Sequence, residues 1–122
     1  MSHNIEVEFL FKRLTDFQLL RIVRAQKHAY VAWITAYLSD VFISNRVAYG
    51  VTFAHTLRDT NVRYADGHFI RTAAIRSVCK EGRFWVVSTS DARYVITSFK
   101  KDVGRASFHT LLRSSVEGFR TP

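Results

Sequence analysis

Hydrophobic residues in the first third of the chain recur with a helical period. They stand mostly three or four positions apart in the series Phe17, Leu20, Val23, Val31, Ile34 and Leu38. This spacing places them on one face of a helix. Residues 15–18 (Thr-Asp-Phe-Gln) have the Thr-x-x-Gln form of a capping box, which satisfies free amides at a helix start. The pattern predicts a long helix that begins after Thr15 and runs to Leu38.

The second half of this predicted helix, residues 29–38, is apolar on almost every side. Such a helix is usually central, with other elements packed on more than one face. In a small domain the neighbouring elements can leave part of it uncovered, and the surplus then forms a dimer interface. We expect either a fully buried helix or, with a slight preference, a homodimer formed through Tyr30, Trp33 and Tyr37.

Residues 41–59 are compatible with two structures. In the first, Ser44 and Asn45 cap a second helix from Arg46 to about Arg58, although Gly50 weakens it. In the second, the segment is extended, because apolar residues alternate at positions 47, 49, 51 and 53. We favour the helix. Residues 5–11 also alternate at first and predict either a short strand or the lead-in to the next element.

The chain changes character after residue 61. Short β-rich runs cover residues 62–64, 69–72, 75–79, 84–89 and 93–99, with turn signals between them, the first at Asp66-Gly67. Such runs at regular spacing predict an antiparallel meander. A closing helix follows Gly104 and covers residues 105–116, with Gly118 as its C-terminal cap. We therefore predict an α+β fold. A long N-terminal helix and a second helix pack on a small antiparallel meander, a C-terminal helix closes it, and residues 1–122 form one domain.

Charge is the feature of the composition that points to a partner. The chain has 18 Lys and Arg against 10 Asp and Glu, a net charge of +8. Most of the excess lies in residues 62–122, which hold eleven basic and five acidic side chains. A positive charge concentrated in one half attracts polyanions, and nucleic acid in particular. The alternative is a basic protein whose charge has no ligand.

The runs at residues 84–89 and 93–99 carry the candidate binding residues. Alternation along a strand places Arg83 and Trp85 on one side of the first run, and Arg93 begins the second. Rings next to guanidinium groups are typical of single-stranded nucleic-acid sites. The alternative is that Trp85 belongs to the core and the arginine stems cover an apolar edge. The complete set of predicted anion-binding residues is Arg71, Arg83, Trp85, Arg93, Lys100, Lys101 and Arg105.

Three of these cations, Lys100, Lys101 and Arg105, stand at the start of the closing helix. Cations there oppose the helix dipole and do not stabilise the helix. An anion held by the free amides and these side chains would explain the arrangement. A solvated run of charges with Asp102 in its midst is the alternative.

Signatures of catalysis are weak. His109 and His55 are the candidate acid and base of a small metal-independent ribonuclease of toxin type, provided that the fold brings them together. The histidine spacing and the single Cys79 argue against a metal site, and nucleotide-binding glycine loops are absent from the sequence. We expect no cofactor and, on balance, no enzymatic activity.

The remaining expectations concern location and partners. The start of the sequence lacks a signal-peptide pattern, the apolar stretches are too short for a membrane span, and Cys79 is alone. We therefore expect a cytoplasmic protein without membrane contact. The function predicted from the sequence is a small basic module that binds nucleic acid or another anionic partner. The alternatives are the ribonuclease and an assembly subunit that dimerises through the long helix. A small-molecule pocket among the phenylalanines stays open.

Overall fold

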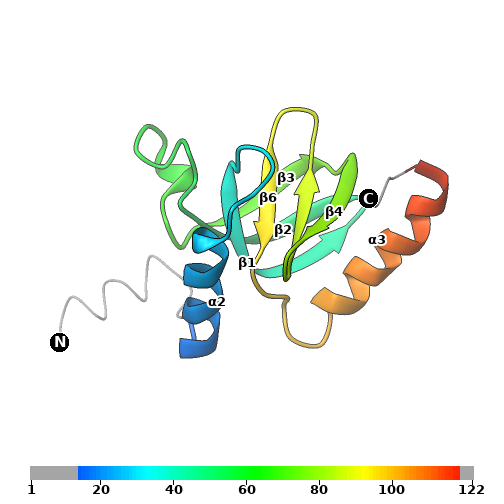
Figure 1. Cartoon of the computed structure of the whole chain (residues 1–122), viewed down its shortest axis with the longest axis horizontal. Helices are drawn as coiled ribbons and strands as arrows, with labels where there is room; N and C mark the ends of the chain where they lie inside the picture. The colour runs from blue at the N-terminus through cyan, green and yellow to red at the C-terminus, as the bar shows by residue number, and fades with distance from the viewer. Residues whose placement is uncertain (1–13, 119–122) are drawn as a thin grey trace.

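The computed structural model describes residues 14–118 of the chain, and the strand suggested for residues 5–11 lies outside this range. The elements are α2 (Asp16–Lys27), β1 (Ala36–Ser44), β2 (Val47–Phe53), η1 (Val62–Tyr64), β3 (Phe69–Ala74), β4 (Ser77–Glu81), β5 (Phe84–Ser88), β6 (Arg93–Ile96) and α3 (Gly104–Gly118). Figure 1 shows the two α-helices on opposite flanks of the sheet. The predicted α+β class is confirmed.

The six strands form one mixed sheet in the order β3-β2-β1-β6-β5-β4. Neighbouring strands are antiparallel except β1 and β6, which pair in parallel, with Ala36 opposite Tyr94 and Leu38 opposite Ile96. The predicted purely antiparallel meander is therefore wrong at this one seam. It arises because β1, whose first residues 36–38 were predicted to end the long helix, lies between the two antiparallel halves.

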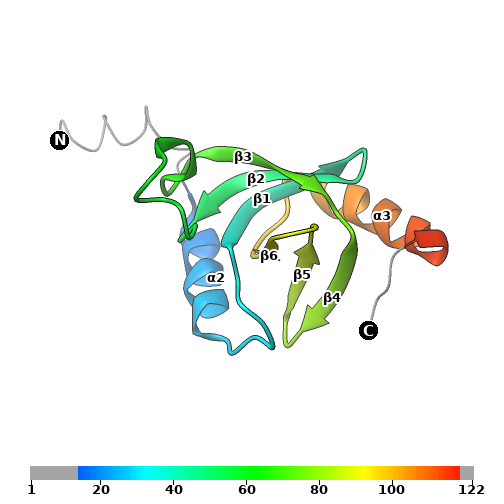
Figure 2. The same cartoon turned by 90° about the horizontal axis from the view of Figure 1, so that it is seen from above.

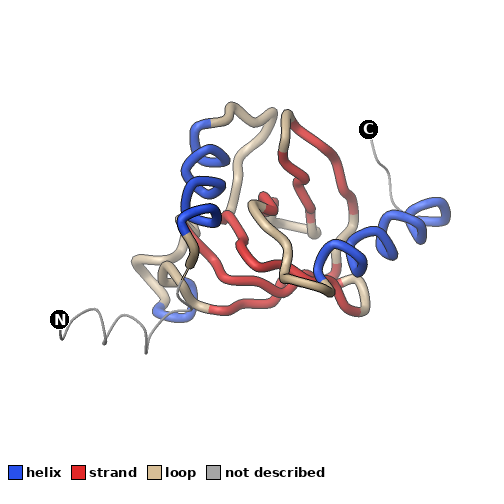
Figure 3. The backbone as a smooth tube through the Cα atoms, turned by 90° about the horizontal axis from the view of Figure 1, so that it is seen from below, coloured by secondary structure: helices blue, strands red, loops and turns tan. Residues whose placement is uncertain are grey.

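The sheet is strongly curled, because its two edge strands are consecutive in the sequence. Ile75 and Arg76 alone separate β3 from β4. The Ile75 amide donates to Arg46 O beyond the end of β1, and the Arg76 amide donates to Ser88 O at the end of β5. The chain thus passes directly from one edge to the other. Figures 2 and 3 show the resulting open, barrel-like curl from above and below.

The first helix begins where the sequence predicts and ends much earlier. Thr15 Oγ1 accepts from the Gln18 amide at 3.1 Å and Gln18 Oε1 accepts from the Thr15 amide at 2.9 Å, so the capping box is confirmed. The helix ends at Lys27, and β1 begins at Ala36. The predicted continuation to Leu38 is wrong. Only residues 36–38 of the apolar stretch enter a strand, where aromatic and aliphatic side chains are packed on both faces. Residues 28–35 form a loop, in which Val31 and Trp33 are exposed.

The predicted second helix is also wrong, and the extended alternative is correct. Residues 36–44 and 47–53 form a hairpin, and the turn residues Asn45 and Arg46 have φ of 52° and 65°. Two successive positive φ values are typical of the type I′ turn, whose twist matches that of paired strands. Asp66-Gly67 does not join two strands, because residues 62–64 form the single turn η1. The strands and closing helix predicted after residue 69 are present.

Two groups of buried residues hold the fold together. Inside the curl, Leu38, Val41 and Ile96 pack against Phe108 and Leu111 of α3. On the opposite face of β5 and β6, the residues that pack together are Ala25 of α2, Phe84, Val86 and Val95. Strands β5 and β6 are therefore covered on both faces, and α2 and α3 are fixed at different ends of the curl (Figure 2). Neither helix described here has the length and apolarity needed to cross a membrane.

Candidate anion-binding site

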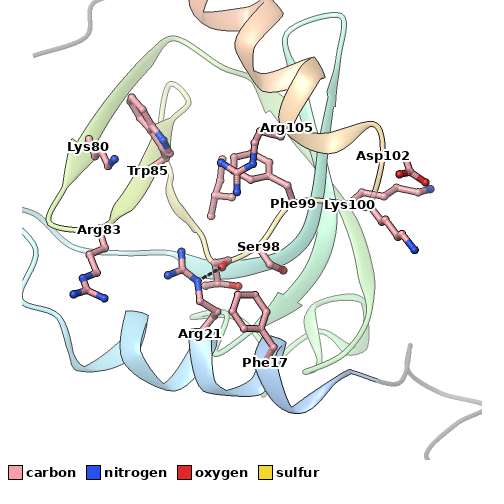
Figure 4. A pocket seen from close by; sticks show the side chains of 13 residues that line it. Phe17, Arg21, Lys80, Arg83, Trp85, Ser98, Phe99, Lys100, Asp102 and Arg105 are labelled. Atoms are coloured by element: carbon pink, nitrogen blue, oxygen red, sulfur yellow. Dashed lines mark hydrogen bonds between the residues drawn. The ribbon is translucent and has the colours of Figure 1, made fainter.

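A basic pocket of about 520 Å³ opens between α2, the β4–β5 hairpin and the segment that leads from β6 into α3. Its described cationic lining residues are Arg21, Lys80, Arg83, Lys100, Lys101 and Arg105. Asp102 is the one acidic residue among the lining residues that the structure describes. Figure 4 shows Arg21 and Arg105 near the middle of the pocket, with Arg83 and Lys100 toward opposite sides. We call this the basic pocket.

Arg21 is the cation contributed by α2. Its Nε donates to Thr97 O at 3.0 Å (Figure 4), and its guanidinium carbon lies 4.7 Å from the centre of the Phe84 ring. Partial burial lowers the pKa of Arg21, and the nearby positive charges, first that of Arg105, lower it further. A guanidinium stays protonated in a protein even so. Arg21 thus combines partial burial with the repulsion of neighbouring cations.

Aromatic rings, in place of carboxylates, hold two further cations of the pocket. Lys80 Nζ lies 5.4 Å from the centre of the Trp85 ring, and the guanidinium carbon of Arg105 lies 4.7 Å from that of Phe99. Such contacts position a cation without cancelling its charge. Among residues 14–114, whose side chains the structure describes, none of the six lining cations forms an ion pair. Their charge therefore remains available to a ligand.

The N-terminus of α3 adds the positive end of a helix dipole to the same pocket. The Lys100 amide donates to Val41 O at 2.9 Å, and the Gly104 amide donates to Lys100 O at 2.8 Å, which fixes the start of the helix against β1. A Cβ on Gly104 would lie 2.2 Å from Val41 O, so this approach requires glycine. The amides of a first helical turn attract anions. The start of α3 is thus held where it strengthens the positive potential of the pocket.

The structure brings together five of the seven residues predicted to bind an anion. They are Arg83, Trp85, Lys100, Lys101 and Arg105. The three cations at the start of the closing helix, Lys100, Lys101 and Arg105, thus line the same pocket as Arg83 and Trp85. Trp85 fits both interpretations of the sequence, because its ring packs edge-on against Phe108 at 5.0 Å and also lines the pocket.

The other two predicted cations lie elsewhere. Arg93 is mostly buried and pairs with Glu81, with Nη2 2.6 Å from Oε2, while its Nη1 donates to Ala32 O at 2.8 Å. Glu81 also accepts from the Val31 amide at 2.9 Å. Arg93 therefore fastens the 28–35 loop to the sheet and does not line the pocket. Arg71 is exposed on β3 and lines a second cavity.

The predicted anion-binding set left out other lining residues of the pocket, and those with cationic or aromatic side chains are Phe17, Arg21, Lys80 and Phe99. Lys80 had a usable signal, because it lies in the same predicted hairpin as Arg83. Arg21 had none, since 76 positions separate it from Thr97, the residue whose carbonyl it contacts. Phe17 was assigned to the buried face of a helix, yet its side chain is 66% exposed at the edge of the pocket.

The two candidate catalytic histidines are not brought together. His55 follows β2 in the loop on one flank of the molecule and His109 lies on α3 at the other, as Figures 1 and 2 agree. His55 is buried, which lowers its pKa, and its Nδ1 accepts from the Leu57 amide at 3.0 Å. Neither histidine lines the basic pocket. Among residues 14–118, no three His, Cys, Asp or Glu side chains gather as a metal site would need.

The predicted dimer residues do not share a helical face, because the helix ends before them. Tyr30 donates its hydroxyl to Ala25 O at 2.7 Å and, like Tyr37, packs against the hydrophobic group beneath α2. Trp33 is 77% exposed in the loop before β1. Association through Trp33 stays a prediction.

The chain was also compared with known proteins. No protein-family model, curated protein or solved structure was found to match it.

Proposed function

We propose that this chain is a non-enzymatic binding module that holds phosphate groups of a nucleic acid in the basic pocket. One observation carries the proposal. Six cations from three separate parts of the sequence converge on a pocket of about 520 Å³, and none of them is paired with a carboxylate within the described residues. Like charges repel, so a gathering of this kind is stabilised when an anion occupies it.

The types of cation favour phosphate. Arg21, Arg83 and Arg105 present planar guanidinium groups, which bind phosphate oxygens through two parallel hydrogen bonds. Lys100 and Lys101 supply mobile point charges at the start of α3.

The size of the pocket favours more than an isolated ion. Its volume of about 520 Å³ is in the range of cavities that hold whole organic ligands. The cations also lie on several sides of it (Figure 4), so they can contact successive phosphates of an extended chain. Trp85 and Phe17 add rings beside these cations, the combination that single-strand sites use. The volume, the placement of the cations and the rings together favour binding of a nucleic-acid segment.

The composition of the lining also favours binding over cleavage. A metal-independent ribonuclease needs a proton acceptor and a proton donor beside the scissile phosphate. The described lining contains no histidine, and its one carboxylate, Asp102, lies near Lys100 (Figure 4). We therefore expect the protein to bind oligonucleotides without cleaving them.

The test measures binding of a fluorescent mixed-sequence oligonucleotide at increasing salt. For the wild type, affinity should fall steeply with salt, because each phosphate contact releases a counterion. Arg83→Gln and Arg105→Gln should each reduce the slope of log K against log salt by about 0.7, the value for one contact to a single strand. Arg76→Gln and Arg113→Gln are matched controls, since these exposed arginines do not line the pocket.

Two results would overturn the proposal. The first is an affinity that does not change with salt, and the second is an equal effect of pocket and control variants. Gel analysis of the bound RNA provides a separate check. Cleavage that disappears in His109→Ala would instead support the ribonuclease.

A further inference from the structure

A second surface lies on the outer face of β1, β2 and β3. The rings of Phe42, Tyr49 and Phe69 gather there, one from each strand. Their centroids are 4.9 Å apart for Phe42–Tyr49, 6.2 Å for Tyr49–Phe69 and 6.3 Å for Phe42–Phe69, and their planes lie within 25° of one another. Three rings in nearly parallel planes across neighbouring strands make what we call the aromatic surface.

The register of the strands explains why these rings meet outside the core. Phe42 is directly opposite Tyr49, and Tyr49 is directly opposite Arg71. Along β3 the exposed residues 69, 71 and 73 alternate with the buried Ile70 and Thr72. Residues that oppose each other on the same face of a sheet are neighbours in space. Phe42, Tyr49 and Arg71 therefore form one row across three strands, with Phe69 beside it.

Cations stand at both ends of the aromatic surface. On the β1 side, Lys100 Nζ lies 5.1 Å from the centre of the Phe42 ring. On the β3 side, Arg71 belongs to a second cavity of about 480 Å³. Its described lining residues are Tyr49, Arg63, Tyr64, His68, Phe69, Ile70 and Arg71, and none of them is acidic. The rings thus lie between two positively charged regions.

Lys100 joins this surface to the basic pocket, because it lines the pocket and also contacts Phe42. A continuous path results. It runs from the basic pocket over Lys100 and Phe42 to Tyr49 and Phe69, and then into the second cavity with Arg71. Cations alternating with rings along a path fit a ligand that has phosphates and planar groups in alternation.

We propose that the aromatic surface stacks the unpaired bases of a single-stranded nucleic acid whose phosphates contact the basic pocket at one end and Arg71 at the other. This inference rests on the proposed function and specifies its ligand. In a duplex the base faces are already stacked on each other, whereas in a single strand they are free to stack on protein rings. Phe69 is 61% exposed, so its ring is accessible to a base.

Charge argues for a nucleic acid over a second copy of this chain as the occupant. A second copy would bring another +8 to a surface already flanked by Lys100 and Arg71. Like charges across an interface oppose association. A polyanion would instead be attracted by the cations at both ends of the aromatic surface.

The experiment compares three probes of equal length by fluorescence anisotropy. They are a single strand of about 12 nucleotides, within the range of ~4–16 that one small domain covers, an abasic strand with the same phosphates, and a blunt duplex. The single strand is tested as both DNA and RNA. Wild-type protein should bind the single strand at least about fivefold more tightly than either other probe, the scale of one stacked base.

Phe69→Ala and the matched control Trp33→Ala assign this preference to the aromatic surface. Both rings are exposed, at 61% and 77%, so folding should survive either change. Phe69→Ala should weaken binding of the single strand about fivefold or more and leave the abasic strand unchanged. Trp33→Ala should change neither, because Trp33 lines neither the basic pocket nor the second cavity.

The outcomes separate this inference from the proposed function. Equal binding of the single strand and the abasic strand, still dependent on salt and on Arg105, would overturn base stacking and keep the basic pocket as a phosphate site. Tighter binding of the duplex, or an equal loss in both ring variants, would also overturn base stacking. Failure of every probe to bind would overturn both proposals.

Discussion

The guanidinium of Arg21 lies over the ring of Phe84, with its Cζ 4.7 Å from the ring centre. This contact joins α2 to β5 at the edge of the basic pocket. One helical turn farther along, Ala25 is completely buried against the same hydrophobic group as Phe84. The packing that docks the helix therefore also fixes the cation. Arg21 is held in position before any ligand arrives, which reduces the entropy lost on binding.

We predict that Arg21→Gln weakens oligonucleotide binding about tenfold, the scale of one charge-assisted contact. Arg21→Lys should bind with intermediate affinity, because lysine keeps the charge and cannot reproduce the Nε–H bond to Thr97 O. Arg24→Gln is the control, since Arg24 is exposed on the same helix and does not line the pocket. Anisotropy titrations at fixed salt provide the measurement. Equal losses for Arg21 and Arg24 would show that total charge, and not position, governs binding.

We also predict that Gly104→Ala disrupts both stability and binding. The added Cβ would lie 2.2 Å from Val41 O and 3.0 Å from the Phe99 Cβ, so the start of α3 must move away from β1. Forcing atoms into a packed site lowers the free energy of unfolding by about 1–3 kcal/mol. Binding should weaken as well, because Lys100 and Arg105 move with the helix start.

Urea denaturation measures the first effect and anisotropy the second. Ala106→Gly is the comparison, an exposed change in the same helical turn that lowers helix stability by about 1 kcal/mol without a clash. If Gly104→Ala retained wild-type stability and affinity, the close approach of α3 to β1 would not be what positions these cations.

Local signals in the sequence predicted the elements that depend on neighbouring residues. The Thr15 capping box needs only the residue three positions ahead, and both of its hydrogen bonds are present. The strands from Ser77 to Ile96 are separated by short turns whose residues mark them clearly. Where adjacent residues determine the structure, the pattern was sufficient.

The error at residues 29–38 has a different origin. Ala36 and Leu38 face the interior of the curl, while Tyr37 packs on the side covered by α2. At these positions burial on both faces removes the alternation by which a strand is recognised, and the run then resembles a helix. Residues 29–35 are instead a loop, and the exposure of its apolar residues Val31 and Trp33 could not be read from the sequence. The turn at Asn45-Arg46 also lacks the glycine that usually marks a two-residue hairpin. In both segments the structure depends on contacts with residues that are distant in the sequence.

The candidate site was predictable only where its residues are close in sequence. Arg83, Trp85, Lys100, Lys101 and Arg105 lie within one charged segment and were identified together. Arg21 reaches the pocket because α2 packs on β5, a contact that no periodicity reveals. The aromatic surface depends on the register of β1, β2 and β3. It could not be seen while residues 46–58 were assigned to a helix.

We predict that Glu81→Gln lowers the free energy of unfolding at pH 7 by about 2–3 kcal/mol. The change leaves Arg93 without its charge partner at a site where the two side chains are only 18% and 11% exposed. It also weakens the contact of Glu81 with the Val31 amide. Asp59→Asn, an exposed change in the loop after β2, is the control.

The effect of Glu81→Gln should depend on pH. Burial alone would raise the pKa of Glu81, but the Val31 amide and Arg93 outweigh it and leave the pKa below its usual 4.5. A carboxylate with a lowered pKa stabilises the fold above its unfolded pKa and loses that effect as the pH falls through the folded value. The difference between wild type and Glu81→Gln should therefore shrink between pH 5 and pH 3, in the pH range set by the unfolded pKa of 4.5. A constant difference across this range would mean that the charge of Glu81 contributes nothing.

His55 should make the protein less stable as the pH falls below about 6.5, for a reason visible in its contacts. Its Nδ1 accepts from the Leu57 amide at 3.0 Å and its ring stacks on Tyr64 at 4.1 Å, so the neutral ring fits and a proton on Nδ1 would break the hydrogen bond. Burial lowers the pKa of His55 below its ordinary 6.5, so the unfolded chain binds this proton first and stability falls with the pH. His55→Asn keeps an acceptor near the Nδ1 position and cannot titrate in this range. Urea denaturation from pH 7.5 to 5.5 should show a smaller decline in the variant than in the wild type. Identical pH profiles would mean that His55 accepts a proton in the folded state as easily as in the unfolded chain.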